Sequence, residues 1–240
     1  MLIKIALNGA RLKEQNKYIP QSLTEIEKEV SLLYDYGCKV FHIHCYDENG
    51  KESLKPKDVN NLVQLVKHIS LEIQIGISSG DWIEPDLEKR KSYIKAWENK
   101  PDFISLNMIE DDALEISELL IEKGVLIEAG LNEKRAAEIL IKSNVIKDCC
   151  RILIEPEPEE LDLAIETINE IEKVLDANNV KIPRLLHGFN SVSWEILREA
   201  KKRGYDGRVG MEDTIYLENG EMVKSNLEII QHANKILKAT

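Results

Sequence analysis

The stretch KVFHIHC (residues 39–45) alternates apolar and polar side chains with the two-residue period of a β-strand. Val40, His42 and His44 share one face, and the other face is formed by Phe41, Ile43 and Cys45. A strand that packs helices on one side and presents histidines to the inside of a closed sheet needs this division. The stretch therefore predicts a strand with a functional inner face.

Seven further runs rich in aliphatic and β-branched residues predict strands of the same kind. Together with residues 39–45 they make eight predicted strands, and the others are LIKIALN (2–8), EIQIGIS (72–78), DFISLNM (102–108), VLIEA (125–129), CRILIE (150–155), RLLHG (184–188) and GRVGM (207–211).

Amphipathic segments between these runs predict helices. Ser22 and Glu25 form a capping box at the start of the first, Pro56 precedes the second and Pro85 precedes the third. The predicted helices cover residues 23–36, 57–69, 86–98, 112–123, 132–142, 159–177, 192–203 and 225–238.

Eight strand and helix units in 240 residues give about thirty residues per unit, and no Pro/Gly/Ser-rich linker separates them. The pattern predicts an α/β fold, a single-domain (β/α)8 TIM barrel over residues 1–240. An open doubly wound sheet is the alternative, but it is disfavoured because no GxGxxG follows the first strand.

Charge and composition exclude several classes of protein. Lys and Arg total 32 against 43 Asp and Glu, a net charge of −11, which leaves no general electrostatic footprint for nucleic acid. The first residues lack the apolar run of a signal peptide, and no stretch approaches the length of a membrane span. Four cysteines without CxxC spacing do not predict a disulfide framework. We expect a cytoplasmic protein that binds no nucleic acid and no membrane.

Catalytic groups of such barrels gather where the strands end. His42 and His44 lie on one face, roughly 7 Å apart between Cα atoms, so both rings can converge on one metal ion. Glu212, after the eighth strand, is the predicted third ligand, and a His2Glu set suits Zn(II) with an open position. The alternatives are that the histidines hydrogen-bond within the barrel and that Glu212 or Asp213 caps a turn.

Other polar residues follow nearly every predicted strand. Taken singly, the serines and asparagines are common turn formers, and Glu128 could pair with Arg135 on the next helix. Together they predict a polar pocket around the metal. The residues are Asn8, Arg11, Ser78, Ser79, Ser105, Asn107, Glu128 and His187.

These motifs resemble the β-keto acid cleavage enzyme family over essentially the whole chain. HxH together with RxGxED is the specific combination, and the segments are ALNGAR (6–11), HIHCYDENG (42–50), GISSGD (76–81), SLNM (105–108), VLIEAG (125–130), LLHG (185–188) and RVGMEDT (208–214). The resemblance implies a barrel that binds one Zn(II) through His42, His44 and Glu212. It also implies a homotetramer.

The resemblance further implies an enzyme that uses acetyl-CoA as co-substrate. The implied reaction takes a β-keto acid and acetyl-CoA to acetoacetate and a new acyl-CoA by Claisen and retro-Claisen steps, an acyl transfer with carbon–carbon cleavage. The implied residues are Arg208, Asp213 and Glu128 for handling the proton, Ser78, Ser105 and Asn107 for the substrate carboxylate, and His187 as pocket lining.

Several positions depart from the family pattern. Arg11 stands where the amino-substrate enzyme carries an acidic residue, so we expect a neutral or anionic β-keto acid. Ser105 replaces a threonine, Tyr46 stands where many relatives have arginine, and Asp81 replaces a glycine.

Three other functions compete with this one. A metal-dependent hydrolase barrel would place histidines on strands five and six, where this chain has Glu128 and Glu155. An aldolase or isomerase barrel would carry a glycine-rich phosphate loop after strands seven and eight. A non-catalytic metal-binding barrel would not need Arg208 and Glu128, whose buried charges cost stability.

Overall fold

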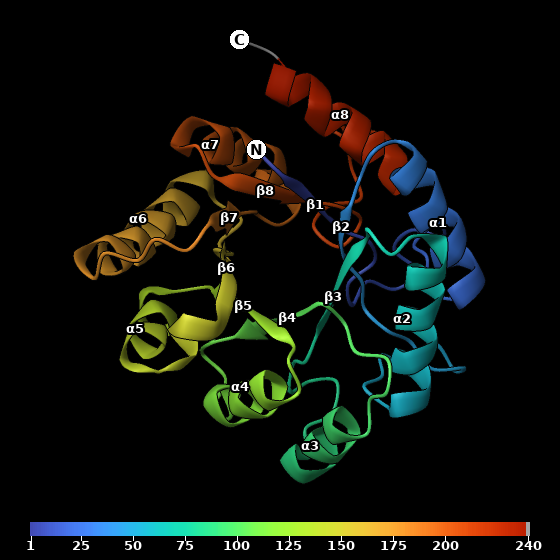
Figure 1. Cartoon of the computed structure of the whole chain (residues 1–240). Helices are drawn as coiled ribbons and strands as arrows, with labels where there is room; N and C mark the ends of the chain where they lie inside the picture. Colours follow the sequence, from blue (N-terminus) through green and yellow to red (C-terminus); the bar gives the residue numbers. More distant parts are fainter. Residues whose placement is uncertain (239–240) are drawn as a thin grey trace.

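A computed structural model of the chain describes residues 1–238, so the last two residues of the predicted domain 1–240 lie outside the described residues. Within the described residues, eight parallel strands close into one barrel in chain order, with β8 pairing to β1 (Figure 1). The predicted TIM barrel is confirmed. The strands are β1 (Ile3–Ala6), β2 (Val40–His42), β3 (Gln74–Ser78), β4 (Phe103–Asn107), β5 (Leu126–Leu131), β6 (Cys149–Ile154), β7 (Arg184–Leu186) and β8 (Asp206–Val209).

The helices surround the barrel and cover the outside of the strands (Figure 1). The capping box of Ser22 and Glu25 is present at the first helix, and Pro56 begins the second, as predicted. The helices are α1 (Leu23–Asp35), α2 (Pro56–Ile69), α3 (Leu87–Lys95), α4 (Ala113–Glu122), α5 (Lys134–Lys142), α6 (Leu161–Ala177), α7 (Ser193–Arg203) and α8 (Asn226–Lys238), with short 3-10 helices η1 (Val145–Asp148) and η2 (Asn190–Val192).

Six of the predicted strands end earlier than expected, and two of them lead to the predicted metal ligands. The run 39–45 forms a strand only over β2, because beyond it the side chain of Asn8 takes over the bonding: its Oδ1 accepts from the His44 N–H at 2.8 Å and its Nδ2 donates to the His44 carbonyl at 3.0 Å. The run 207–211 ends at Val209, because the chain then turns and the Gly210 carbonyl accepts from two later backbone N–H groups. His44 and Glu212 therefore stand on loops just past their strands.

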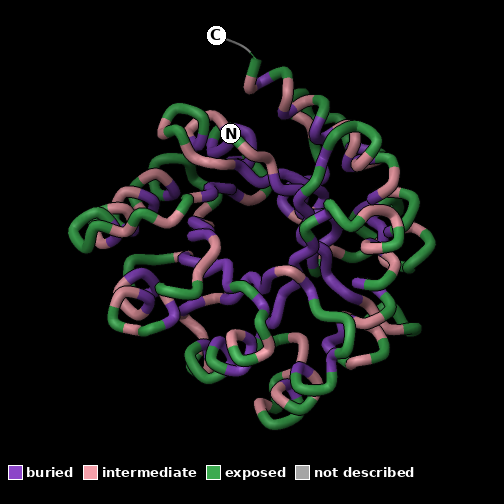
Figure 2. Tube along the Cα trace, in the orientation of Figure 1, coloured by how far each residue is buried: buried purple, intermediate pink, exposed green. Residues whose placement is uncertain are grey.

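The apolar core lies between the strands and the helices, and buried segments follow the barrel wall (Figure 2). Phe41, Ile43 and Cys45, the predicted outer face of the second strand, all belong to it. Between residues 1 and 238, no helix combines the length and the apolar character needed to cross a bilayer.

Candidate active site at the mouth of the barrel

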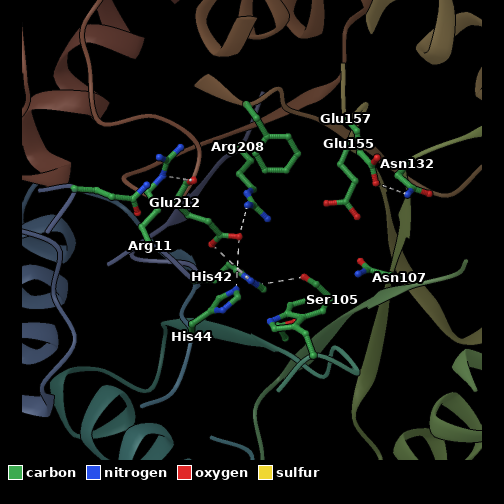
Figure 3. A pocket seen from close by; sticks show the side chains of 15 residues that line it. Arg11, His42, His44, Ser105, Asn107, Asn132, Glu155, Glu157, Arg208 and Glu212 are labelled. Carbon is green, nitrogen blue, oxygen red and sulfur yellow. Dashed lines mark hydrogen bonds and ion pairs between the residues drawn. The ribbon is translucent and has the colours of Figure 1, made fainter. Parts of the chain in front are cut away.

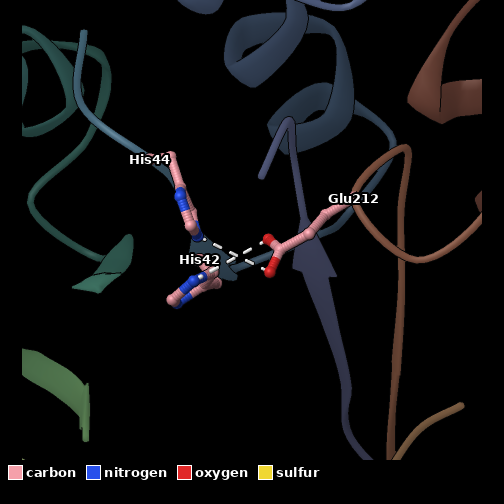
Figure 4. Close-up of side chains that lie close together, drawn as sticks. All are labelled: His42, His44 and Glu212. Atoms are coloured by element: carbon pink, nitrogen blue, oxygen red, sulfur yellow. Dashed lines mark ion pairs between the residues drawn. The ribbon is translucent and has the colours of Figure 1, made fainter. Parts of the chain in front are cut away.

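His42, His44 and Glu212 converge at the carboxyl ends of β2 and β8 (Figure 4). Their ligand atoms all lie within 4.8 Å of one another. His42 Nε2 is 3.7 Å from Glu212 Oε2, and His44 Nε2 is 3.6 Å from Glu212 Oε1. The two imidazole rings are edge-to-face, with centroids 5.1 Å apart. Both Nε2 atoms therefore face the same carboxylate.

Two glycines, Gly9 and Gly210, leave the space that the Glu212 segment occupies. A Cβ at Gly210 would lie 1.8 Å from the Ala6 carbonyl oxygen, so only glycine lets the end of β8 approach β1 this closely. Gly9 has a φ of 61°, and a Cβ there would lie 2.2 Å from Cγ of Glu212. The Tyr46 hydroxyl donates to the Gly9 carbonyl, so this departure from the family pattern braces the loop beside the site.

The Nδ1 atom of each histidine also has a partner. His44 Nδ1 contacts the carboxylate of Glu52, which also accepts from Trp82 Nε1 at 3.2 Å. His42 Nδ1 lies 3.2 Å from Ser105 Oγ. Metal-ligating histidines commonly use the second ring nitrogen in this way, which orients the ring. Sequence reasoning missed Glu52, although the turn-forming run DENG at 47–50 predicts that the chain folds back there.

The donor set fits a divalent metal ion. Within residues 1–238, buried Glu212 Oε2 has no hydrogen-bond partner, although it is aimed at His42. Ligand atoms about 2.0–2.1 Å from a tetrahedral zinc lie about 3.3 Å apart. The distances from the two histidine Nε2 atoms to the Glu212 carboxylate oxygens, 3.7 and 3.6 Å, are close to this value. Burial lowers the pKa of His42 well below its ordinary value, which keeps the ring in the neutral, ligating form. Burial also acts to lower the pKa of His44, but Glu212 and Glu52 outweigh it and raise the pKa to about 9. The two carboxylates therefore stabilise a positive charge at this position.

Arg208 and Asp213 form a paired group beside these three residues. Arg208 Nε and Nη2 donate to Asp213 Oδ1 at 3.1 and 2.8 Å, and Nη2 also donates to Glu212 Oε1 at 2.5 Å. Burial acts to raise the pKa of Asp213, but the Arg208 guanidinium lowers it. Both carboxylates thus bond Arg208 side chain to side chain, and the alternative that they cap a turn is wrong.

His187 is fully buried between two carboxylates. Its Nδ1 lies 3.2 Å from Asp213 Oδ1, and its Nε2 lies 3.2 Å from Glu155 Oε2. The implied position of His187 as pocket lining is corrected, because Glu155 lines the cavity described below and His187 does not. Glu155 follows β6 directly and is a site residue that the sequence analysis used only to weigh the hydrolase alternative.

A cavity of about 440 Å³ opens above His42, His44 and Glu212, which we call the candidate metal-binding set. Arg208, Glu212 and Arg11 line one side, and Glu155, Glu157 and Asn132 lie across from them (Figure 3). The predicted Ser78, Ser105 and Asn107 also line it, as do the two histidines, whereas Glu128, His187 and Asp213 do not.

Arg11 is fixed at the cavity wall by the loop that carries Glu212. Its Nε donates to the Glu212 carbonyl at 2.9 Å, and its Nη2 donates to the Asp213 carbonyl at 3.0 Å and to Asn190 Oδ1 at 2.5 Å. All these acceptors are uncharged. In the described part of the chain no carboxylate lies within ion-pair distance of Arg11, so its positive charge remains available to a ligand.

A charged layer lies inside the barrel beneath the site, and Glu128 belongs to it. Glu128 stands in the middle of β5, not at its end, and pairs with Lys4 and with Arg151 Nη1 at 2.7 Å rather than with Arg208 or Arg135. Burial acts to raise the pKa of Glu128, but Lys4 and Arg151 hold it well below its ordinary value. The predicted set of Arg208, Asp213 and Glu128 is thus divided between two layers.

Replacing Glu128 should cost far more stability than replacing its lysine partner. Glu128→Gln leaves two buried cations without a carboxylate, and we expect a loss of about 3–5 kcal/mol in the free energy of unfolding. Lys4→Met leaves Glu128 paired with Arg151, so we expect a much smaller loss. Urea unfolding of both variants checks this, and equal losses would contradict the charge arrangement.

Comparisons with known proteins point to one family. A family model described as beta-keto acid cleavage enzyme matches residues 1–147 and 150–240. A 3-keto-5-aminohexanoate cleavage enzyme from Fusobacterium nucleatum subsp. nucleatum is 22% identical over 261 residues, covering 99% of this chain and 91% of that protein. An enzyme of the same name from Acetoanaerobium sticklandii is 22% identical over 263 residues, covering 99% of this chain and 92% of that protein.

A solved structure described as a ternary complex of ObcA with a C4-CoA adduct and oxalate is similar in fold. Its TM-score is 0.73 at 15% identity, and the match covers 92% of this chain. This chain spans 64% of the length of that one.

Proposed function

The chain belongs to the beta-keto acid cleavage enzyme family, and from this we propose that it is a zinc-dependent acyltransferase with acetyl-CoA as co-substrate. The proposed reaction takes R–CO–CH2–COO⁻ and acetyl-CoA to acetoacetate and R–CO–CoA. The C2–C3 bond of the β-keto acid breaks, its C1–C2 unit joins the acetyl group, and the released acyl group R–CO is carried away on CoA. The partners are therefore a small β-keto acid and acetyl-CoA.

The convergence of His42, His44 and Glu212 at the floor of an open cavity is the observation that carries this proposal. When bound there, Zn(II) would supply Lewis-acid stabilisation of the negative charge that develops on the keto oxygen as the C2 proton leaves. Two further findings support the choice of substrate classes: the relatives are named for 3-keto-5-aminohexanoate cleavage, and the ObcA complex is described as holding a CoA adduct.

The other residues of the site have separate roles in this proposal. Arg208 faces the cavity and provides a fixed positive charge for a substrate carboxylate, while Asp213 orients it from behind with two hydrogen bonds. Ser78 and Asn107, at the ends of β3 and β4, supply uncharged hydrogen-bonding groups for the same carboxylate. The homotetramer and the cytoplasmic location are part of the same proposal.

The experiment that tests the reaction incubates the zinc-loaded protein with acetyl-CoA and a panel of β-keto acids. Acetoacetate and the new acyl-CoA are measured by mass spectrometry, and the double variant His42→Ala/His44→Ala is the control. Metal-dependent formation of both products supports the proposal. Release of free acids without a new acyl-CoA would contradict it and favour a hydrolase.

Arg11 should select against cationic substrates on its side of the cavity. We expect neutral and anionic β-keto acids to be preferred, and Arg11→Gln to improve the relative kcat/KM of a cationic analogue by about tenfold. This corresponds to about 1.4 kcal/mol between unit charges about 12 Å apart at an effective dielectric constant near 20. The measurement is a competition between analogues of matched size.

Arg135→Gln, the same charge change at an exposed position on α5, is the control and should leave the preference unchanged. A wild-type preference for the cationic analogue would contradict the role of Arg11. It would show instead that Glu155 and Glu157, on the opposite wall, decide the substrate charge.

A further inference from the structure

The geometry points to a hydroxyl-bridged relay, Glu128–Ser105–His42, that fixes which ring nitrogen of His42 carries the proton. In this inference Glu128 and Ser105 are positioning residues: they hold the proton on Nδ1 of His42 and leave Nε2 free to bind the metal. The inference rests on the proposed function, because the tautomer of His42 matters only if its Nε2 binds a metal ion. It also assigns Ser105 a role other than holding the substrate carboxylate.

Glu128 is the acceptor at the buried end of this relay. Its side chain is wholly inaccessible to solvent and is surrounded by three donors: the Lys4 ammonium, Arg151 Nη1 at 2.7 Å and Ser105 Oγ at 2.6 Å. The two cations keep it ionised, and an ionised carboxylate only accepts hydrogen bonds. The Ser105 hydroxyl therefore donates its proton to Glu128.

The Ser105 hydroxyl has only one proton to donate, and this determines which nitrogen of His42 is protonated. With that proton on the bond to Glu128 Oε2, only the lone pairs of Ser105 Oγ can face His42 Nδ1, 3.2 Å away. The contact is a hydrogen bond only if His42 Nδ1 carries a proton. Neutral His42 then has its lone pair on Nε2, the atom that faces Glu212 Oε2 at 3.7 Å.

The barrel places these groups by strand register. Ser105 on β4 pairs in register with Ser78 on β3 and with Glu128 on β5, so the three side chains form one row across neighbouring strands. His44 gets its partner differently, by direct contact of Nδ1 with Glu52 from the loop after β2. The two ligating histidines are thus oriented by two separate carboxylates, one direct and one through a hydroxyl.

The test uses three substitutions in the full-length protein. Ser105→Ala removes the bridge, Ser105→Thr keeps the hydroxyl, and Ser78→Ala removes the neighbouring hydroxyl that does not contact His42. Ser105 variants are used instead of Glu128 variants because loss of Glu128 leaves two buried cations unpaired. Zinc affinity is measured by competition with a chelator. The protonated nitrogen of His42 is identified in the metal-free protein by ¹H–¹⁵N correlation spectra, with the His42 signals assigned by their loss in His42→Ala.

We expect wild-type His42 to be protonated on Nδ1, and Ser105→Ala to lose that preference and bind zinc about 10–100-fold more weakly. Ser105→Thr and Ser78→Ala should keep both properties within about threefold. Wild-type His42 protonated on Nε2, or unchanged zinc affinity in Ser105→Ala, would overturn the relay. Failure of the wild-type protein to bind zinc would contradict the proposed function instead, and the spectra would still decide the tautomer.

Discussion

Glu212→Gln is expected to lower turnover by about a thousandfold and to weaken zinc binding in parallel. Glu212 supplies the only carboxylate of the three-residue set found within residues 1–238, and it bridges both histidines and Arg208. Loss of several kcal/mol of stabilisation of the developing oxyanion corresponds to this factor, since about 1.4 kcal/mol is tenfold in rate. Zinc content after dialysis and kcat are the two measurements.

The control for this prediction is Glu157→Gln, which removes a carboxylate that lines the same cavity away from the candidate metal-binding set. It should retain zinc at wild-type stoichiometry. Full zinc content and near-normal kcat in Glu212→Gln would show that the three residues do not form the metal site.

Arg208→Lys is expected to lower kcat/KM by about 100–1000-fold while the protein remains folded. Lysine keeps the positive charge, but it cannot donate from two nitrogens to Asp213 and at the same time reach Glu212. The factor corresponds to about 2.7–4 kcal/mol, within the range for disrupting a buried, hydrogen-bonded charge pair, here that between Arg208 and the substrate carboxylate. Steady-state kinetics measure kcat/KM, and a thermal unfolding scan shows whether the variant remains folded.

Arg184→Lys is the matched control, because Arg184 begins β7 at the other end of the barrel and pairs with Asp176. It should leave kcat/KM unchanged. Arg208→Met, by contrast, leaves Asp213 and Glu212 buried without a cation and should lose about 3–5 kcal/mol of stability. If Arg208→Lys keeps more than a third of the wild-type kcat/KM, Arg208 does not have the role proposed here.

The sequence was sufficient for the barrel and for the convergence of His42, His44 and Glu212. The repeated alternation of strand and helix patterns requires only local information, and it predicts the closed sheet that the structure shows. His42 and His44 are two residues apart, so their common direction follows from strand geometry alone. Glu212 is distant in sequence, but the end of the eighth strand must lie beside the first in a closed barrel.

The partners of Glu128, His187 and His44 could not be predicted, because these contacts join side chains that are distant in the sequence. Glu128 was expected to close its strand and to act with Arg208, but β5 continues to Leu131, and Lys4 and Arg151 on two other strands capture the carboxylate. His187 was expected to line the pocket, but it is buried against Asp213 and Glu155, and His187 is not among the residues that line the cavity. Glu52 escaped notice because a loop brings it to His44, and loop geometry is not encoded by a strand period.

One isotope experiment tests the central claim most directly. The zinc-loaded protein is given an unlabelled β-keto acid and acetyl-CoA carrying ¹³C at both acetyl carbons, and the products are analysed by mass spectrometry. The proposed reaction predicts acetoacetate heavier by two mass units, with an unlabelled acyl-CoA formed from the β-keto acid. Unlabelled acetoacetate, or label only in acetate and no new acyl-CoA, would contradict it.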